Sequence, residues 1–495
     1  MDIRAKVLQA PTGREPIMPP SSDPNTSSRI TWAILGSVSF GALLNSMMGS
    51  VINVAMPDIA REYSVDPSRA AWVVLGFLLA VTVLLLFAGR LGDLLGQGRV
   101  YLVGFAVFGA ASLGCALAPT LSVLIATRVA QGVGASLVMS TAPALLIQSA
   151  PPNRRGFALG IMSTAVYVGL AIGPPVGGEL VGWLGWRSIF FAMVAVSVIV
   201  FSIAVRVVPT RKPPRQPHAL DPMGAVLVGG GILALLLACA RAPVWGWTHS
   251  GTIALTAVGV VLLPAAIMFE LKHPTPTLDP RVFRSSVFSS AAAAAVLNYV
   301  TLFLATYLLP FALRDGQHME PSMVGRVIAS QAAGMALFAF ASGWLSDKLG
   351  PRGLAAGGML VTGTGLFGLS MSWPTAGMMI PMLWLFVCGA GVGLFISPNS
   401  SALMGAAPRA QQGSAGGVMA LSRSFGMALG VAIASGIFAT AFPGGTIVGW
   451  PEGADAVVQT GLRIGALAAL LGAVVSYFGH ARHDVFAGAP KPQSN

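Results

Sequence analysis

Long runs of apolar residues, separated by short polar stretches, follow one another along almost the whole chain. A helix of about 20 apolar residues is about 30 Å long, which is enough to cross the hydrocarbon core of a bilayer. The pattern therefore predicts fourteen transmembrane helices. They are expected to begin near Ile30, Ala70, Val100, Leu121, Phe157, Ser188, Pro222, Gly251, Val287, Met323, Gly353, Gly377, Ser414 and Val458.

The composition excludes a soluble protein. Of the 495 residues, 55% are hydrophobic and 9% are charged, a balance that soluble folds of this length do not have. We therefore expect an all-α integral membrane protein. Cys115, Cys239 and Cys388 lie in apolar runs without metal-ligand spacing. Neither a His-Glu-x-x-His nor a Gly-x-Ser-x-Gly pattern occurs, so we expect no enzyme activity, no metal and no cofactor.

The net charge of +12 does not indicate nucleic-acid binding, because the basic residues gather in alternate loops. One set of loops holds most of them, including Arg99, Arg154, Arg155, Arg211, Lys212, Arg215, Lys272, Arg281, Arg284, Lys348, Arg352 and Arg409. The positive-inside rule then places both termini in the cytoplasm. Residues 1–29 are polar and proline-rich, which predicts a disordered cytoplasmic tail and not a cleaved signal peptide.

Two predicted cytoplasmic loops share one pattern. Gly89–Gly96 and Gly343–Gly350 both read Gly-x-Leu-x-Asp-x-Leu-Gly, which indicates an internal duplication. The glycines permit a tight turn, and the aspartate at a helix end can bond backbone N–H groups or pair with a base. We expect gating loops, with a plain capped turn as the alternative. The candidate gating positions are Gly89, Asp93, Gly96, Gly343, Asp347 and Gly350.

The duplication predicts two six-helix bundles with two helices inserted between them. The prolines after Val208 mark a linker out of the first bundle. The expected order is a tail at 1–29, a bundle at 30–208, a cytoplasmic linker at 209–221, the inserted helices at 222–272, a second cytoplasmic linker at 273–286, a bundle at 287–480 and a cytoplasmic tail at 481–495.

The fifth predicted helix contains an unusual cluster of small residues and proline: Gly169, Gly173, Pro174, Gly177 and Gly178. Proline and glycine are both unfavourable inside a helix. The cluster makes sense where a helix bends and a neighbour packs closely against it. Ordinary small-residue packing of membrane helices is the alternative.

Taken together, these motifs resemble the major facilitator superfamily, in particular its fourteen-helix drug:proton antiporter branch. The resemblance rests on the two repeated loops and on the segments Asn53–Pro57, Arg128–Gly134, Gly169–Gly178, Trp186-Arg187 and Trp245–Trp247. It covers about Ile30 to His480 and implies proton-driven export by alternating access in the bacterial plasma membrane. The implied partners are a small-molecule substrate, protons and the lipid bilayer, and a monomer is expected.

Arg128 is the strongest candidate for proton coupling. An arginine well inside a membrane span is costly unless it faces protein or water, and Gln131 lies on the same helix face. The resemblance implies that Arg128 serves proton coupling and faces the central cavity. A structural arginine bonded to carbonyl groups of a neighbouring helix is the alternative. For Arg423, in the thirteenth span, we favour a structural role.

The first helix departs from the family pattern. Counting back from Pro57, Met48 stands where this branch usually has an aspartate. A thioether carries no proton and attracts no cation. The coupling carboxylate is therefore sought elsewhere, and Glu179 in the outer part of the fifth span is the candidate, with an exposed glutamate as the alternative.

The substrate cavity is expected at the midplane between the two halves. Its candidate lining residues are Asn45, Met48, Asn53, Gln131, Asn298, Tyr299, Tyr307, Gln331 and Asn399. Each is equally or more readily explained by helix packing. The leading function is proton-coupled export of amphipathic drug-like or secondary-metabolite compounds. Dedicated export of one endogenous metabolite or lipid-like compound is second, and a non-transporting membrane sensor is third.

Overall fold

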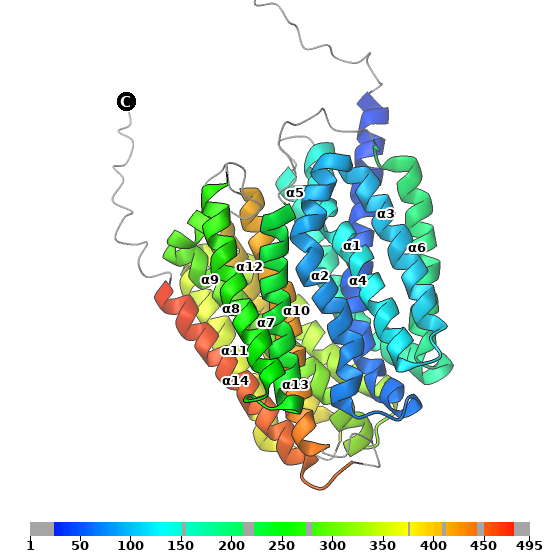
Figure 1. Ribbon diagram of the computed structural model, residues 1–495, viewed down its shortest axis with the longest axis vertical. Coiled ribbons are helices and arrows are strands. Elements are labelled where there is room, and N and C mark those ends of the chain that lie inside the picture. Colours follow the sequence, from blue (N-terminus) through cyan, green and yellow to red (C-terminus); the bar gives the residue numbers. More distant parts are fainter. Residues whose placement is uncertain are drawn as a thin grey trace, which may run out of the picture.

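The computed structural model describes residues 24–150, 155–210, 222–273, 280–374, 377–407, 412–442 and 450–479. Within these residues it contains fourteen helices that are long and apolar enough to cross a membrane. The prediction of fourteen spans is therefore confirmed, and Figure 1 shows the helices side by side. The expected tails fall largely outside the described residues, as do most of the linker at 209–221 and part of the linker at 273–286.

The membrane-length helices are long, and several include polar turns at their ends. Their bounds are α1 Pro24–Glu62, α2 Pro67–Leu95, α3 Gln97–Ala116, α4 Leu121–Ser149, α5 Arg155–Leu184, α6 Arg187–Val207, α7 Pro222–Trp245, α8 Ser250–Lys272, α9 Ser286–Phe311, α10 Pro321–Leu349, α11 Pro351–Ser372, α12 Met379–Ala406, α13 Gln412–Ala441 and α14 Ala454–Gly479. Two short helical segments, η2 Pro280–Arg284 and η3 Ala312–Gly316, flank α9.

The first six and the last six helices form two bundles with the same internal arrangement. In the first bundle α1 packs on α5, and α4 packs on α2 and α3. In the second, α9 packs on α13, and α12 packs on α10 and α11. Equivalent glycines make these contacts close: a Cβ at Gly169 would clash with the carbonyl oxygen of Leu43, and a Cβ at Gly426 would lie 2.6 Å from that of Val296. The two halves are therefore structural repeats.

The two ends of the molecule are distinguished by the helices that begin and end there. At the proximal end α1 begins and α14 ends; the opposite end is the distal end (Figure 1). Because each helix crosses once, both repeated loops lie at the proximal end. The last glycine of each repeat has a positive φ, 97° at Gly96 and 76° at Gly350. Only glycine adopts such values readily, so these glycines allow the tight turns between α2 and α3 and between α10 and α11.

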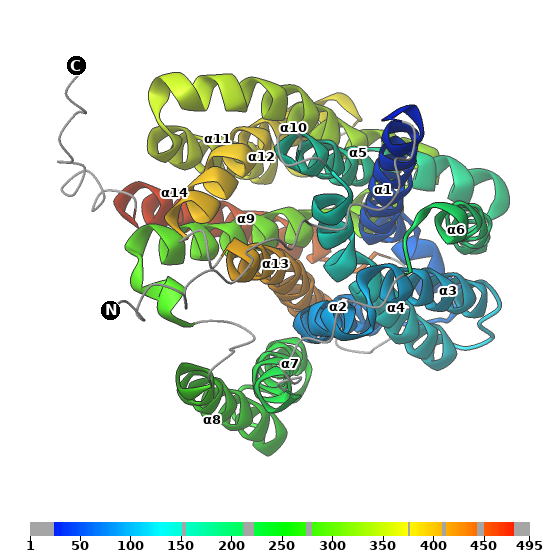
Figure 2. The same ribbon diagram turned by 90° about the horizontal axis from the view of Figure 1, so that it is seen from above.

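The inserted helices α7 and α8 pack on each other at the side of the molecule (Figure 2). α7 contacts both α2 of the first bundle and α13 of the second. Arg241 of α7 supports this position through a cation–π contact, with its guanidinium carbon 4.3 Å from the ring centre of Trp72. The inserted pair therefore covers one seam between the two halves.

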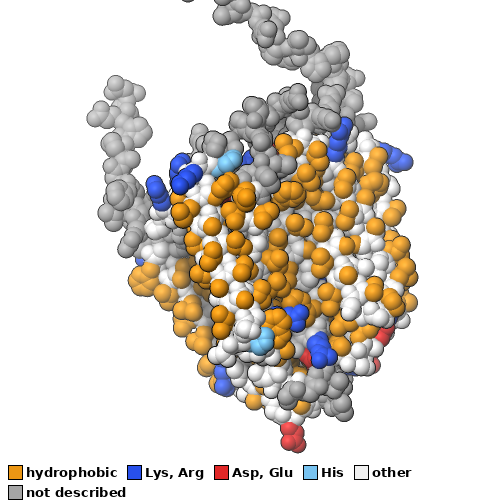
Figure 3. All heavy atoms as spheres, viewed as in Figure 1, with side chains coloured by type: hydrophobic (Ala, Val, Ile, Leu, Met, Phe, Trp, Pro, Cys, Tyr) orange, Lys and Arg blue, Asp and Glu red, His pale blue; other side chains and the backbone are white. Residues whose placement is uncertain are grey.

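The lateral surface suits a bilayer. Figure 3 shows apolar side chains spread over the helices, with most Lys and Arg side chains of this face near the proximal end and Asp and Glu near the distal end. Exposed residues such as Val261 on α8 and Leu467 on α14 are large and hydrophobic, as expected for side chains that contact lipid.

Candidate functional site

Arg128 lies on α4 and is fully buried among α2, α3 and α6. Its Nε donates a hydrogen bond of 2.9 Å to the carbonyl oxygen of Val73 on α2, and one Nη donates a bond of 2.5 Å to Oε1 of Gln131. The guanidinium carbon lies 4.5 Å from the ring centre of Phe77. The second Nη has no partner among the described residues. A buried charge with an unused donor is expensive, so this arrangement is a candidate functional centre.

The hydrogen-bond chain continues from Arg128 into α3. Nε2 of Gln131 donates a bond of 2.7 Å to Oγ of Ser112, and Oγ of Ser112 donates a bond of 2.7 Å to the carbonyl oxygen of Phe108. Three helices, α2, α4 and α3, are thus connected through polar side chains. In the second bundle the equivalent region is uncharged, where Nε2 of Gln331 lies 3.3 Å from Sγ of Cys388.

Asparagine amides tie the first helix of each bundle to the fourth. Asn45 of α1 donates a bond of 3.3 Å to the carbonyl oxygen of Ala135 on α4. Asn399 of α12 donates a bond of 3.0 Å to that of Ala291 on α9. Asn298 on α9 is the counterpart of Asn45 on α1. Asn45 lies two residues after Leu43, whose carbonyl oxygen faces Gly169, and Asn298 lies two residues after Val296, whose carbonyl oxygen faces Gly426.

Two of the predicted cavity residues are buried without partners. Asn53 and Asn298 are both fully buried, and neither amide oxygen nor amide nitrogen has a hydrogen-bond partner among the described residues. Leaving such groups unpaired costs about 1–3 kcal/mol each. They are therefore expected to gain partners, either water or substrate, in another conformation. Met48 is also fully buried.

Glycines bring the two halves into contact at the distal end. Gly178 of α5 faces Gly325 of α10: a Cβ on Gly178 would lie 2.6 Å from the carbonyl oxygen of Pro321, and a Cβ on Gly325 would lie 2.6 Å from that of Pro174. The backbones thus touch directly. Gly173 and Gly177 instead pack against α1, so the predicted glycine cluster serves two different neighbours.

An ion pair lies beside this glycine contact. Nη2 of Arg326 on α10 lies 2.9 Å from Oε1 of Glu179 on α5, with the two side chains 60% and 35% exposed. Glu179 is thus not an isolated exposed glutamate, because its partner comes from the other half. Both groups are partly exposed, so the pair contributes little to stability by itself.

A second ionic cluster joins the halves between α1 and η3. Nε of Arg61 donates a bond of 2.9 Å to Oδ1 of Asp315. Arg314 in turn lies 3.3 Å from Oδ1 of Asp58, which also pairs with Arg61 at 3.2 Å. The charges alternate in sign across the contact, so they hold the distal ends together.

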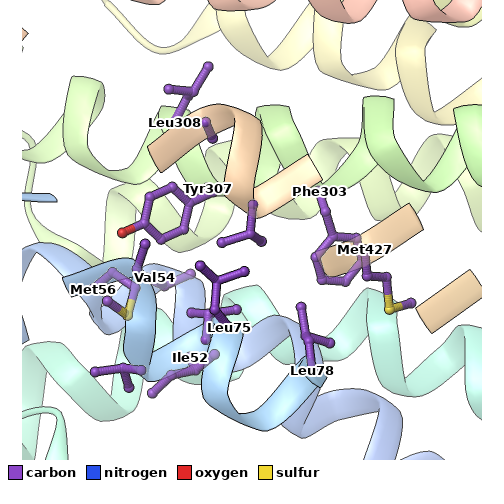
Figure 4. Packing of buried hydrophobic residues seen from close by; sticks show 14 of the residues in the cluster. Ile52, Val54, Met56, Leu75, Leu78, Phe303, Tyr307, Leu308 and Met427 are labelled. Atoms are coloured by element: carbon purple, nitrogen blue, oxygen red, sulfur yellow. The ribbon is translucent and has the colours of Figure 1, made fainter. Parts of the chain in front are cut away.

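Hydrogen bonds and apolar packing complete the distal contact. The hydroxyl of Tyr307 on α9 donates a bond of 2.5 Å to the carbonyl oxygen of Pro67 on α2. Figure 4 shows Phe303 of α9, Met427 of α13 and Leu78 of α2 in one buried apolar cluster. Within the first bundle, Tyr63 in the distal turn after α1 donates a bond of 2.8 Å to the carbonyl oxygen of Ala118 between α3 and α4, and burial raises the pKa of this phenol.

One side of α1 borders open space midway along the helix. A Cβ on Gly49 would meet no atom within 4 Å, and Ser46, one turn away on the same side, is half-buried. On α13, a Cβ on Gly416 would likewise meet nothing within 4 Å, and Arg423 two turns further is half-buried. The accessible positions of α1 and α13 therefore lie between the buried apolar cluster and the proximal end of the molecule.

The structure does not bring the predicted site residues together in one place. Arg128 and Gln131 are bonded to each other inside the first bundle. Glu179 and Tyr307 lie at the distal contact between the halves. At the repeated loops, Asp93 accepts a bond of 2.9 Å from Nε2 of Gln97. Gly343 and Asp347 belong to α10, and only their side-chain surroundings lie outside the described part of the structure.

Sequence patterns did not identify the residues of the opposite half that pair with Glu179, Asp58 and Arg61. These residues are Arg326, Arg314 and Asp315, and all three lie near distal helix ends. A signal was present in the sequence: charged residues in the expected outer turns of facing halves carry opposite signs. Ser46 was missed because a serine inside an apolar run is most simply explained by helix packing.

Two repeated six-helix bundles that meet at one end, with buried polar groups along their interiors, define a membrane transporter built from internal repeats. The sequence profile of the Major Facilitator Superfamily matches residues 38–431 and 291–492. The chain therefore belongs to the Major Facilitator Superfamily, and its fourteen helices form the fold of that family with two inserted helices.

Relatives with known names are transporters and resistance proteins. The chain is 31% identical to the riboflavin transporter RibZ of Clostridioides difficile, over 82% of this chain and 88% of the relative. It is 29% identical to the tetracenomycin C resistance and export protein of Streptomyces glaucescens, over 81% and 75% of the two chains. It is 30% identical to the multidrug resistance protein Stp of Mycobacterium tuberculosis, over 79% and 72%.

Solved structures support the fold. A peptide transporter crystallised with sulfate superimposes with a TM-score of 0.66 at 17% identity, covering 93% of this chain and 99% of that one. A bacterial homologue of the human lysosomal transporter Spinster, in an inward-facing and unoccupied conformation, gives a TM-score of 0.63 at 17% identity, covering 96% and 100%.

Proposed function

We propose that this chain is a proton-coupled exporter of amphipathic drug-like or secondary-metabolite compounds that works by alternating access. The observation that carries the proposal is the contact of Gly178 with Gly325, where the two halves meet backbone to backbone at the distal end. A contact without side chains can separate and re-form with little rearrangement. Relatives named for resistance and export agree with the outward direction.

The proposed location is the bacterial plasma membrane, with the proximal end and both termini in the cytoplasm. The described basic residues of the proximal end, among them Arg99, Lys272, Arg281 and Arg352, support this orientation. The conformation described is then closed toward the outside. The repeated loops at the proximal end act as gates, because they lie where the halves must approach each other in the opposite state.

Proton coupling is assigned to Glu179, in its distal ion pair with Arg326, and to the buried Arg128. When Glu179 is ionised it pairs with Arg326 of the other half. When it takes a proton from outside, the ion pair is lost and the distal end is free to open. Moving one charge through a membrane potential of 100 mV supplies roughly 2.3 kcal/mol, which exceeds the ~1.4 kcal/mol needed for a tenfold gradient.

Transport in everted vesicles tests this function. Vesicles that contain the protein are energised, and proton release is followed on addition of ethidium, a neutral macrolide or an organic anion. Responses to several unrelated compounds are expected from a broad exporter. No proton release with any compound, from protein shown to be folded, would contradict broad proton-coupled export.

The variant Glu179→Gln tests the proton site. An amide mimics the protonated carboxyl group, so we expect the dependence of export on external pH to flatten while membrane insertion and melting temperature stay near wild type. The expected stability change is small, below about 1 kcal/mol, because the ion pair is partly exposed. The measurement is the initial rate of export between mildly acidic and mildly alkaline external pH.

Glu320→Gln is the matched control, because Glu320 is exposed at the same end and its side chain makes no capping bond. Arg326→Gln removes the pair but keeps the carboxylate, and it is expected to weaken distal closure. An unchanged pH profile in Glu179→Gln would remove Glu179 as the proton carrier.

A dedicated exporter of one endogenous compound is the second candidate. It is favoured by Met48, which is fully buried and stands where a cation-attracting carboxylate was expected. The relative named a riboflavin transporter is an example of a protein named for one compound. In the vesicle assay, folded protein that releases no protons on addition of any of the three test compounds would favour this candidate.

A further inference from the structure

The charges of the membrane interior are unbalanced. Each acidic residue in the described part of the chain lies within two turns of an end of its helix or outside the helices. Arg423, in contrast, lies about three turns from the start of α13, and Arg128, about two turns from the start of α4, is fully buried. The middle of this transporter therefore offers positive charge and no carboxylate among the described residues.

Arg423 differs from Arg128 in having no partner. No hydrogen bond, ion pair or ring contact holds its side chain among the residues that the structure describes, and it is half-buried. It lies about three turns, or about 16 Å, from the start of α13 at Gln412. An unpaired arginine at this depth is costly unless it reaches water or an anion, which indicates an accessible position that lacks its counter-charge.

The position of Arg423 along α13 places it at the edge of the distal closure. Met427, one turn further distal, is buried with Phe303 of α9 and Leu78 of α2 (Figure 4). Gly416, two turns proximal on the same face, borders open space. Arg423 therefore lies between the apolar cluster that closes the distal end and the accessible proximal part.

The neighbourhood of Arg423 along α13 is apolar on its distal side. Gly426 packs against Tyr299 of α9, whose Cβ would lie 2.8 Å from a Cβ on this glycine. An anionic group at this depth would meet a guanidinium that can donate two parallel hydrogen bonds. An apolar body attached to that group would contact the side of the cluster formed by Met427 and Phe303.

The first bundle offers a polar but uncharged surface at a similar depth. On α1, Ser46 is half-buried beside the open space at Gly49. A hydroxyl group can donate a hydrogen bond to an anion and adds no competing negative charge. The accessible part of α1 therefore tolerates an anionic substrate.

We propose that Arg423 binds the anionic group of the transported compound, so that the substrate class is organic anions with an apolar, aromatic body. This deepens the proposed function and rests on it. The proposal explains why Met48 is tolerated, because an exporter of anions needs no cation-attracting carboxylate on α1. It also fits the driving force, since a potential that is negative inside expels an anion with roughly 2.3 kcal/mol per charge for each 100 mV.

Binding of two matched dyes tests the proposal without any proton gradient. Fluorescein and rhodamine 123 share a xanthene ring system but carry opposite charge. Titration of the purified full-length protein, followed by fluorescence anisotropy, is expected to show binding of fluorescein about tenfold or more tighter than of rhodamine 123. Equal affinity for the two dyes, tighter binding of rhodamine 123, or no binding of fluorescein would each overturn the proposal.

Variants of Arg423 locate the site. Arg423→Gln is expected to weaken fluorescein binding about tenfold or more, and Arg423→Glu to reverse the preference between the dyes. Arg463→Gln is the matched control, because Arg463 is exposed on α14 on the same face as the exposed Leu467, and no change is expected. Wild-type fluorescein affinity in Arg423→Gln would overturn the assignment.

Two further measurements distinguish anion binding from loss of folding or of coupling. Arg423→Lys keeps the charge and is expected to retain the preference for fluorescein with weaker binding, so the proposal remains testable if the glutamine variant does not fold. Because the titration needs no energised membrane, failure of proton coupling in vesicles leaves its outcome unaffected. Conversely, energised transport that exports both dyes equally would preserve the exporter and contradict the anion site.

Discussion

Replacing Gly178 with alanine is expected to prevent normal closure of the distal end and to reduce export about tenfold or more. The new Cβ would lie 2.6 Å from the carbonyl oxygen of Pro321 and 3.0 Å from Cα of Gly325, both of which are backbone atoms. Backbone cannot rotate away as a side chain can, so α5 and α10 must separate. Overpacking of this kind costs about 1–3 kcal/mol, and each ~1.4 kcal/mol changes the population of the closed state tenfold.

The matched control lies one turn away. A Cβ on Gly182 would have Ser322 as its nearest neighbour, with the backbone nitrogen at 4.0 Å, so Gly182→Ala is expected to leave export unchanged. Both variants add one methyl group to the same helix. A difference between them therefore reports the contact between the halves and not the helix propensity of alanine.

The distance between the halves gives a direct readout. Spin labels at Ser64 and Glu320, both exposed at the distal end on opposite halves, are introduced after replacement of the native cysteines. Electron–electron double resonance is expected to show a longer distance in Gly178→Ala than in wild type, and an unchanged distance in Gly182→Ala. A wild-type distance distribution together with wild-type export in Gly178→Ala would show that the glycine contact does not control closure.

The number and placement of the helices could be predicted from the sequence because apolar length is a strong signal. The expected starts at Leu121 and Pro222 coincide with those of α4 and α7. The largest differences are at α1 and α14, which begin at Pro24 and Ala454 and not at Ile30 and Val458. These helices extend into polar turns beyond the apolar run, where hydropathy carries no information.

The contacts between the halves could not be predicted from the sequence. Periodicity identifies the face of a helix, but the partner of that face depends on how two separate bundles dock. Glu179 and Arg326 are 147 residues apart, and Arg314 and Asp58 are 256 apart. The glycine cluster of α5 illustrates the limit: close packing was expected, but the division between α1 and α10 follows from the docking of the second bundle.

Arg128→Ala is expected to reduce energised transport at least about a hundredfold while leaving insertion into the membrane intact. The substitution removes the bonds to the carbonyl oxygen of Val73 and to Gln131, and it removes the cation that faces Phe77. Losing bonds made by a charged group costs about 1.5–3 kcal/mol each, so two such bonds correspond to about a factor of a hundred or more.

A graded series separates transport from structure. Arg128→Lys keeps the charge but cannot make both bonds with one planar group, so intermediate transport is expected. Ser112→Ala removes only the far end of the chain, the acceptor for Nε2 of Gln131, and a small loss is expected. The measurements are the initial export rate, its dependence on external pH, and the melting temperature of each purified variant.

The pH profile decides between a coupling and a purely structural role for Arg128. If the arginine only holds α2 against α4, the variants lose transport in proportion to their melting temperature and the shape of the pH profile is unchanged. If the buried cation participates in proton coupling through the Nη that lacks a described partner, Arg128→Lys loses pH dependence at near-wild-type stability. Wild-type transport in Arg128→Ala would remove this residue from the mechanism, because alanine can neither carry a charge nor replace the bond to Val73.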